Sequence, residues 1–265
     1  MEDSPQKLHL PDNKFIAYHK HEGKQNHPFV IFLGGFMSDM SGIKATSLEK
    51  FCKNKGYSFI RFDYFGHGQS SLEFTDCTIS TWKQNVLDVI DNLTSGKQIL
   101  IGSSMGGWLM ILAALARPER IAALIGIASA PDFTEELIWE QMNQTQQAQL
   151  LEKGIYNLSS EYGEAPYPIT LDLIEDGRKH LLLKVADNSN NDSPFTIHDS
   201  QLPIRLIHGL KDKDVPSSWT TRMARIINSN NIKVNLVENG DHRMSTPENI
   251  KLLCDTLEEV AGLIK

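Results

Sequence analysis

Residues 102–106 read Gly-Ser-Ser-Met-Gly, and this pentapeptide places one serine where it could act as a nucleophile. The pattern Gly-x-Ser-x-Gly fits a single register, which centres on Ser104. A register centred on Ser103 would need glycine where Ile101 and Met105 stand. An apolar, strand-like run precedes the motif and a helix-like run follows it, which is typical of an elbow that lifts a serine hydroxyl above a sheet. We therefore predict that Ser104 is a nucleophile.

A serine hydroxyl needs a base to take its proton, and two later segments offer the base and its acid. The segment HGLKDKDVP (208–216) follows a predicted strand and places Asp212 at the carboxyl edge of the sheet. The segment NGDHRM (239–244) follows the last predicted strand and places His242 on the next loop. Hydrolases with a serine elbow carry their triad in the order Ser, Asp, His, so we predict that Ser104, Asp212 and His242 form a catalytic triad.

Other residues compete for the acid and base roles. Asp214 competes with Asp212, or else caps the helix that follows it. Asp132 comes directly after an earlier predicted strand and is a second rival for the acid. We expect His208 to support its turn and Asp241 to be exposed.

Acyl chemistry also needs backbone donors for the oxyanion that develops on the substrate carbonyl. The elbow supplies the backbone N–H of Met105, the residue after the nucleophile. We expect the second donor in LGGFMSDMSG (33–42), where a glycine pair lets the backbone approach closely. The predicted donor is the N–H of Phe36, and the alternative is that the glycine pair only makes a turn.

The elements that would position these residues alternate between strand and helix. Short apolar runs predict buried strands at 27–33, 57–64, 97–101, 120–129, 203–209 and 232–238. Helical periodicity predicts helices at 43–56, 79–93, 105–117, 217–228 and 248–264. This alternation predicts an α/β fold with a mostly parallel, doubly wound sheet. The segments 6–10 and 14–21 predict an antiparallel hairpin at its edge.

Residues 132–202 interrupt the alternation. They hold a glutamine-rich helical pattern at 132–154, a second helical pattern and a polar loop (187–194), with no clear strand. A structureless insertion of this length is rare in a compact domain, so we predict a helical cap inserted in a core of residues 1–131 and 203–265. The aromatic residues that would line an acyl site, or more commonly form the core of the cap, are Trp139, Tyr156, Tyr162 and Tyr167.

Composition and charge exclude several function classes. The chain has 265 residues and a formal net charge of -7, which argues against nucleic-acid binding. No apolar run reaches the length of a membrane span, so we expect no stable membrane insertion. The three cysteines lack metal-type spacing, and we expect neither a metal nor a cofactor. The N-terminal segment has neither a secretory nor a transit pattern, so we expect a cytoplasmic protein or the mature form of an organellar one.

Taken together, these motifs resemble the α/β-hydrolase superfamily over essentially the whole chain. The resemblance rests on LGGF, FDYFGHGQS (62–70), GSSMGG, HGLKDKDVP and GDH. It implies the α/β-hydrolase fold and the triad named above. It also implies a structural role for residues 62–70, so Asp63 and His67 are not proposed as catalytic.

A narrower resemblance is to the abhydrolase subfamily of acyl-protein thioesterases, which includes mycophenolic acid acyl-glucuronide esterase. It is carried by IRFDYFGHG, GSSMGGWLM, ALARPERIAALIGIAS, PIRLIHGLKDKDVP and DHRM. It implies a serine esterase or thioesterase that acts through an acyl-enzyme on a small-molecule ester or an S-acylated protein. The alternatives are a serine peptidase of the same fold and a non-catalytic, ligand-sensing α/β-hydrolase.

Overall fold

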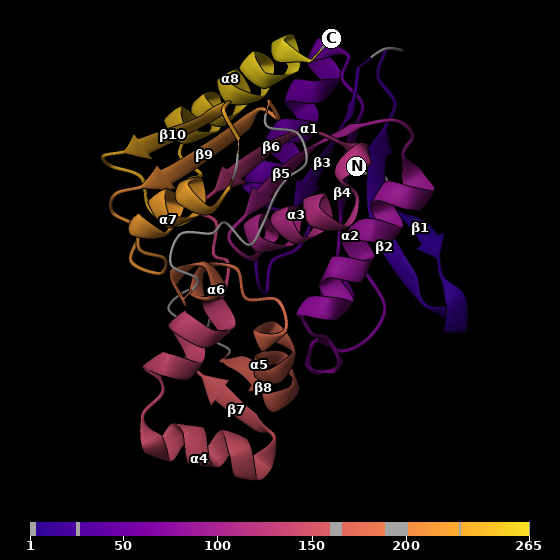
Figure 1. Ribbon diagram of the computed structural model, residues 1–265. Helices are drawn as coiled ribbons and strands as arrows, with labels where there is room; N and C mark the ends of the chain where they lie inside the picture. The colour runs from indigo at the N-terminus through magenta and orange to yellow at the C-terminus, as the bar shows by residue number, and fades with distance from the viewer. Residues whose placement is uncertain (1–3, 25–26, 160–165, 189–200, 228, 265) are drawn as a thin grey trace.

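The main sheet of the computed structural model, which describes residues 4–24, 27–159, 166–188, 201–227 and 229–264, has eight strands (Figure 1). Their order is β1-β2-β4-β3-β5-β6-β9-β10. The strands are β1 (Gln6–His9), β2 (Phe15–His21), β3 (Phe29–Leu33), β4 (Phe59–Phe62), β5 (Gln98–Ser103), β6 (Ile121–Ile127), β9 (Ile204–Gly209) and β10 (Ile232–Val237). The strands β1, β2 and β4 pair antiparallel, and the other pairs are parallel. The predicted parallel sheet and its antiparallel edge hairpin are confirmed.

Helices pack on both faces of this sheet. They are α1 (Ile43–Lys55), α2 (Ile79–Leu93), α3 (Met105–Ala116), α7 (Ser218–Ile226) and α8 (Pro247–Leu263). Neighbouring residues of β5 point to opposite faces, so Leu100 joins the hydrophobic cluster of α2 and α3 while Ile101 joins that of α1 and α8. No helix in the described part of the chain is long and apolar enough to span a membrane.

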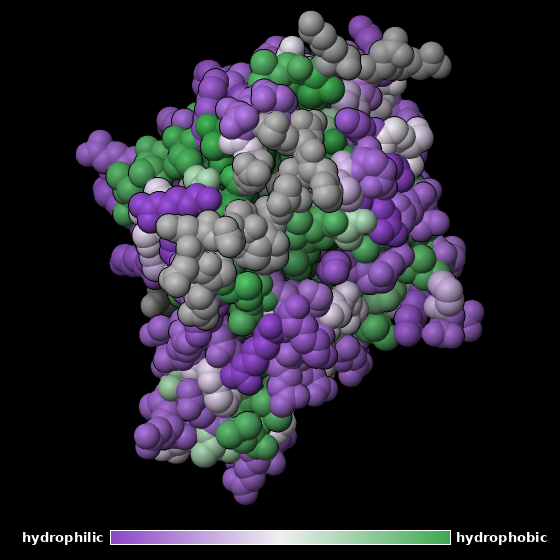
Figure 2. Space-filling model, viewed as in Figure 1, coloured by the Kyte–Doolittle hydropathy of each residue, from purple (hydrophilic) through white to green (hydrophobic). Residues whose placement is uncertain are grey.

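The chain between β6 and β9 forms a separate group of elements on one side of the sheet (Figure 1). These are a π-helical turn (Thr134–Ile138), a 3-10 turn (Trp139–Gln141), α4 (Gln144–Lys153), β7 (Ile155–Leu158), β8 (Tyr167–Thr170), α5 (Leu171–Arg178) and α6 (Leu183–Asn188). In the view of Figure 2 this group is largely hydrophilic, with an apolar area near α4 and β7, where Leu151 and Ile155 are exposed.

Two expectations for this segment are wrong in detail. The sequence shows no clear strand in this segment, yet β7 and β8 form an antiparallel pair. Each strand has only four residues, too few for a clear alternation of apolar and polar positions. The helical pattern at 132–154 is also not one helix, because Asn143 caps α4 in a capping box with Gln146. The division into core and cap stays a prediction, and residues 189–194 of the predicted polar loop lie outside the described residues.

Gly106, in the first turn of α3, allows that helix to pack against the end of β3. A Cβ atom at this position would lie 2.1 Å from the carbonyl oxygen of Leu33 and 2.5 Å from that of Gly34. Main-chain atoms in a central strand cannot move away easily, so we expect Gly106→Ala to lower the free energy of unfolding by about 2 kcal/mol or more. Thermal melting followed by circular dichroism measures this loss.

Gly262→Ala is the matched control for that substitution. Gly262 lies in α8, and a Cβ there would meet no atom within 4 Å. Alanine is the better helix former, so we expect this variant to melt at or slightly above the wild-type temperature. Equal melting temperatures for the two variants would contradict the close approach at Gly106.

Candidate active site

Ser104 occupies the sharp turn between β5 and α3. Its backbone angles are φ 55° and ψ −120°, which a non-glycine residue adopts only where the surrounding structure holds it. Hydrogen bonds between main-chain groups hold this conformation. The Ser104 N–H donates to the carbonyl of Ile127 at 2.9 Å, and the Ser104 carbonyl accepts from Gly107 at 2.9 Å and Ala130 at 3.0 Å. The predicted strand–turn–helix elbow is present, and the serine sits at its apex.

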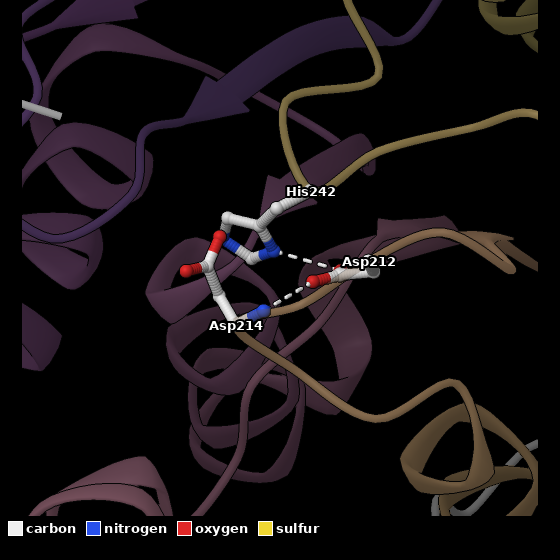
Figure 3. Close-up of side chains that lie close together, drawn as sticks. All are labelled: Asp212, Asp214 and His242. Carbon is white, nitrogen blue, oxygen red and sulfur yellow. Dashed lines mark hydrogen bonds and ion pairs between the residues drawn. The ribbon is translucent and has the colours of Figure 1, made fainter. Parts of the chain in front are cut away.

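His242, in the loop between β10 and α8, bridges Ser104 and Asp212. Its Nε2 lies 3.1 Å from the Ser104 Oγ. Its Nδ1 lies 2.8 Å from an Asp212 carboxylate oxygen (Figure 3). The His242 side chain is 17% exposed, whereas the Asp212 side chain is completely buried. The structure thus brings the three predicted triad residues together, with the imidazole open to solvent and the carboxylate behind it.

Both oxygens of the Asp212 carboxylate accept hydrogen bonds. Oδ1 accepts the backbone N–H groups of Asp214 and Val215, each at 2.9 Å. Oδ2 faces the imidazoles of His242, at 2.8 Å, and His208, at 3.0 Å. Burial raises the pKa of Asp212, but the hydrogen bonds from the two histidines outweigh it and hold that pKa well below its usual value. Asp212 is therefore an anion at neutral pH, which fixes the proton of His242 on Nδ1.

Asp214, the first rival for the acid, lies beside this pair (Figure 3). One potential metal-ligand atom from each of Asp212, Asp214 and His242 lies within 4.8 Å of the others. The hydrogen bond at the His242 Nδ1 goes to Asp212, however, and Asp214 contributes its backbone N–H to the same carboxylate. The group is thus a hydrogen-bonded acid–base pair, and the expectation of a site without a metal or cofactor stays a prediction.

The two predicted oxyanion donors come from two different segments next to Ser104. Met105 is the first residue of α3, and Phe36 lies in the loop after β3. Within the described residues, neither backbone N–H donates to another group of the chain. The loop comes close to the serine, because a Cβ at Gly35 would lie 3.4 Å from the Ser104 Cβ. Phe36 is partly exposed and Met105 is fully buried, and their role as oxyanion donors stays a prediction.

Comparison with known proteins agrees with this fold. Residues 28–164 match a family model described as the alpha/beta hydrolase fold. The palmitoyl-protein thioesterase ABHD10, mitochondrial, of Bos taurus is 38% identical over 257 residues, covering 96% of this chain and 78% of the relative. The protein of that name from Mus musculus is 40% identical over 246 residues, covering 92% of this chain and 78% of the relative. The chain belongs to the α/β-hydrolase family.

A solved structure supports the same assignment for this α/β-hydrolase. Alpha/beta hydrolase domain-containing protein 10 from mouse superposes with a TM-score of 0.85 at 38% identity, covering 97% of this chain and 98% of that one. The predicted family, fold class and enzyme class, a hydrolase of ester or thioester bonds, are confirmed.

In this α/β-hydrolase, side chains of the neighbouring 62–70 loop form hydrogen bonds with the loop that carries Phe36. The Met37 N–H donates to the Nε2 of His67 at 3.2 Å, and the Nδ1 of His67 donates to the Phe65 carbonyl at 3.1 Å. Burial lowers the pKa of His67, which keeps Nε2 unprotonated and able to accept. A carboxylate oxygen of Asp63 accepts the N–H of Met40, farther along the loop, at 2.7 Å. The 62–70 loop thus positions the loop that carries Phe36.

The ring of Phe36 packs in a group of aromatic side chains beside the predicted oxyanion donors. Ring centroids at 5.0–5.9 Å from that of Phe36 belong to Phe74, Trp82, Phe133 and Tyr167. Tyr167 lies on β8, so the inserted segment contacts the loop that carries Phe36. Sequence reasoning missed Phe133, whose position one residue after Asp132 gave no separate signal.

The other predicted cap aromatics have local partners. The guanidinium of Arg178 lies over the ring of Trp139, 4.8 Å from its centroid. The Tyr156 hydroxyl accepts a hydrogen bond from Gln146 at 2.9 Å. Tyr162 lies outside the described residues. Trp139 and Tyr156 therefore fit the alternative in which the aromatic residues form the core of the cap and do not line an acyl site.

Asp132, the second rival for the acid, holds the inserted segment. Its completely buried carboxylate accepts the backbone N–H groups of Leu182, Leu183 and Lys184 at 2.7–3.0 Å, at the start of α6. Among the described residues it makes no hydrogen bond to an imidazole. Burial raises the pKa of Asp132 from 3.8 to about 6, and these N–H groups act against that rise.

This raised pKa leads to a pH-dependent prediction for stability. Between pH 3.8 and about 6 the folded protein binds the Asp132 proton more tightly than the unfolded chain does. Wild-type stability from this group is therefore largest at low pH and falls as the pH rises through that window. Asp132→Asn removes the titration, so we expect the wild-type advantage in unfolding free energy to shrink from pH 4 to pH 7. Urea unfolding of both proteins tests this, and a constant difference would contradict it.

Proposed function

We propose that this chain is a serine hydrolase that cleaves carboxylic esters or thioesters through an acyl-enzyme. Ser104 is the nucleophile, His242 the general base and Asp212 the acid that orients it. The observation that carries the proposal is the hydrogen-bond chain from Asp212 to His242 at 2.8 Å and on to Ser104 at 3.1 Å. This geometry matches the roles of a serine–histidine–aspartate triad.

The reaction proceeds in two acyl-transfer steps. The Ser104 Oγ attacks the substrate carbonyl carbon while its proton passes to the Nε2 of His242. The backbone N–H groups of Phe36 and Met105 bind the oxyanion, a contribution worth roughly 10²–10³ in rate for one donor. The tetrahedral adduct expels an alkoxide or thiolate, which takes the proton from His242. Water then attacks the acyl-enzyme, with His242 again as base, and releases the acid and free Ser104.

The substrate class follows from the relatives and from the aromatic group around Phe36. The relatives are named palmitoyl-protein thioesterases, which supports an S-acylated protein as substrate, with small-molecule esters as the second class. The rings beside the oxyanion donors offer an apolar surface to the acyl group. The acyl site then lies between the core (1–131 and 203–265) and the cap (132–202), on the side of Tyr167.

The location and partners complete the proposal. The relatives carry the word mitochondrial in their names, which supports the mature organellar form over the cytoplasmic one. The net charge of -7 supports a function without nucleic acid. The proposal includes no stable insertion in a membrane.

A fluorophosphonate probe followed by peptide mapping tests the proposed function. We expect a single covalent adduct on Ser104, because the probe reacts with an activated serine and mimics the tetrahedral adduct. A panel of p-nitrophenyl esters of rising chain length, run beside an S-acyl peptide and a peptide amide, then ranks the substrates. Absence of labelling would favour the ligand-sensing alternative, and faster turnover of the amide would favour the peptidase.

A further inference from the structure

A second histidine contacts the carboxylate that orients His242. His208, at the end of β9, is completely buried. Its Nε2 lies 3.0 Å from the Asp212 Oδ2 and 3.0 Å from the carbonyl oxygen of Val215. Its Nδ1 lies 2.6 Å from the hydroxyl oxygen of Thr220, which is on α7. Both ring nitrogens therefore have partners, and one of those partners is the acid of the proposed triad.

The chemistry of these partners fixes the tautomer of His208. The Asp212 carboxylate and the Val215 carbonyl can only accept hydrogen bonds. The Nε2 of His208 must therefore carry a hydrogen, since a lone pair there would face two acceptor oxygens. The Thr220 hydroxyl can donate, so it supplies the hydrogen that the Nδ1 of the neutral ring accepts.

His208 completes the set of donors that a buried carboxylate requires. The Asp212 side chain is completely buried, and among the described residues no lysine or arginine forms an ion pair with it. Its charge is stabilised by the two backbone N–H groups on Oδ1 and the two imidazoles on Oδ2. His208 is held by β9 and α7, so it keeps Oδ2 in front of the His242 Nδ1.

We propose that His208 is a positioning residue for the Asp212–His242 pair and that Thr220 holds its ring in place through Nδ1. The proposal rests on the proposed function, because it concerns the same triad. His208 donates to the oxygen that also accepts from His242, and so reduces the basicity of that oxygen. Without this donor, Asp212 stabilises the His242 imidazolium more strongly, and its carboxylate is free to rotate. The Asp214 carboxylate, within 4.8 Å of the His242 ring, and the flanking Asp241 and Arg243 are unchanged.

The decisive comparison is between His208→Met and His208→Gln. Methionine removes both ring nitrogens, whereas glutamine can place an amide N–H near the position of Nε2. For p-nitrophenyl butyrate we expect His208→Met to lower kcat about 10-fold or more with KM changed less than about 2-fold. We also expect the acidic midpoint of its kcat/KM profile to move to higher pH. His208→Gln is expected to restore most of kcat and the wild-type midpoint.

Thr220 provides a second pair of variants in case His208→Met does not fold. Thr220→Val removes the donor to Nδ1 and keeps His208, so we expect a smaller shift of the acidic midpoint in the same direction. Thr220→Ser retains the hydroxyl and is expected to match the wild type. The fluorophosphonate probe measures the fraction of each variant that has a reactive Ser104. The proposal is overturned if kcat falls only in proportion to that fraction and the acidic midpoint of the kcat/KM profile stays at the wild-type pH. An active Ser104→Ala would instead overturn the proposed function.

Discussion

Ser104→Ala is expected to lower kcat for p-nitrophenyl butyrate by about 10⁴-fold or more, with little change in KM. The Oγ of Ser104 is the atom that forms the bond to the acyl group, and alanine leaves no atom in its place. The nearby oxyanion donors and His242 remain, so a residual rate above that in water is expected. Steady-state kinetics together with loss of fluorophosphonate labelling measure both consequences.

Ser103→Ala is the matched control for this substitution. Ser103 is the adjacent serine at the end of β5, is only 5% exposed and belongs to the alternative register of the motif. We expect this variant to keep kcat within about 3-fold of the wild type, because the substitution leaves the backbone pairing of β5 with β6 unchanged. The nucleophile would have to be reassigned if Ser103→Ala lost the activity and Ser104→Ala kept it.

The three residues of the proposed triad could be predicted from the sequence because each of them follows a strand. Ser104 follows β5, Asp212 follows β9 and His242 follows β10, and these strands lie parallel in one half of the sheet. The carboxyl ends of parallel strands meet at one edge. Residues 138 positions apart, such as Ser104 and His242, therefore become hydrogen-bonding neighbours once the strand order is known.

The choice between neighbouring side chains could not be predicted in this way. Asp212 and Asp214 both follow β9, and strand order places them equally well. The difference comes from the turn itself, where the Asp212 carboxylate folds back onto the N–H groups of Asp214 and Val215 and presents its other oxygen to His242. For the same reason strand order does not predict the contact of His208 with Asp212, which depends on how the His208 ring is oriented.

The inserted segment was harder to predict because its elements depend on distant partners. The four-residue strands β7 and β8 pair across an intervening segment, in a register that joins Ile155 to Thr170. Asp132 was a plausible acid by position after β6, but three backbone N–H groups of residues 182–184 occupy its carboxylate. Neither local propensity nor apolar spacing reports such contacts.

Asp212→Asn is expected to lower kcat by about 10²–10⁴-fold while the protein stays folded. Asparagine keeps the shape of the side chain but replaces one acceptor oxygen with an NH₂ group. If the amide oxygen stays with the backbone N–H groups of Asp214 and Val215, the NH₂ group faces the imidazoles. The Nδ1 of His242 must then accept, its proton moves to Nε2, and the imidazole can no longer take the Ser104 proton.

Asp214→Asn distinguishes this tautomer effect from a general loss of negative charge beside the imidazole. Both substitutions remove one charge within 4.8 Å of the His242 ring, but only Asp212 accepts from the His242 Nδ1. Asp214 acts on the carboxylate through its backbone N–H, which asparagine retains, so we expect kcat to fall less than about 10-fold. Steady-state kinetics at neutral pH compare the two variants. A larger loss for Asp214→Asn than for Asp212→Asn would transfer the acid role to Asp214, because the tautomer argument applies to whichever carboxylate holds the Nδ1 proton.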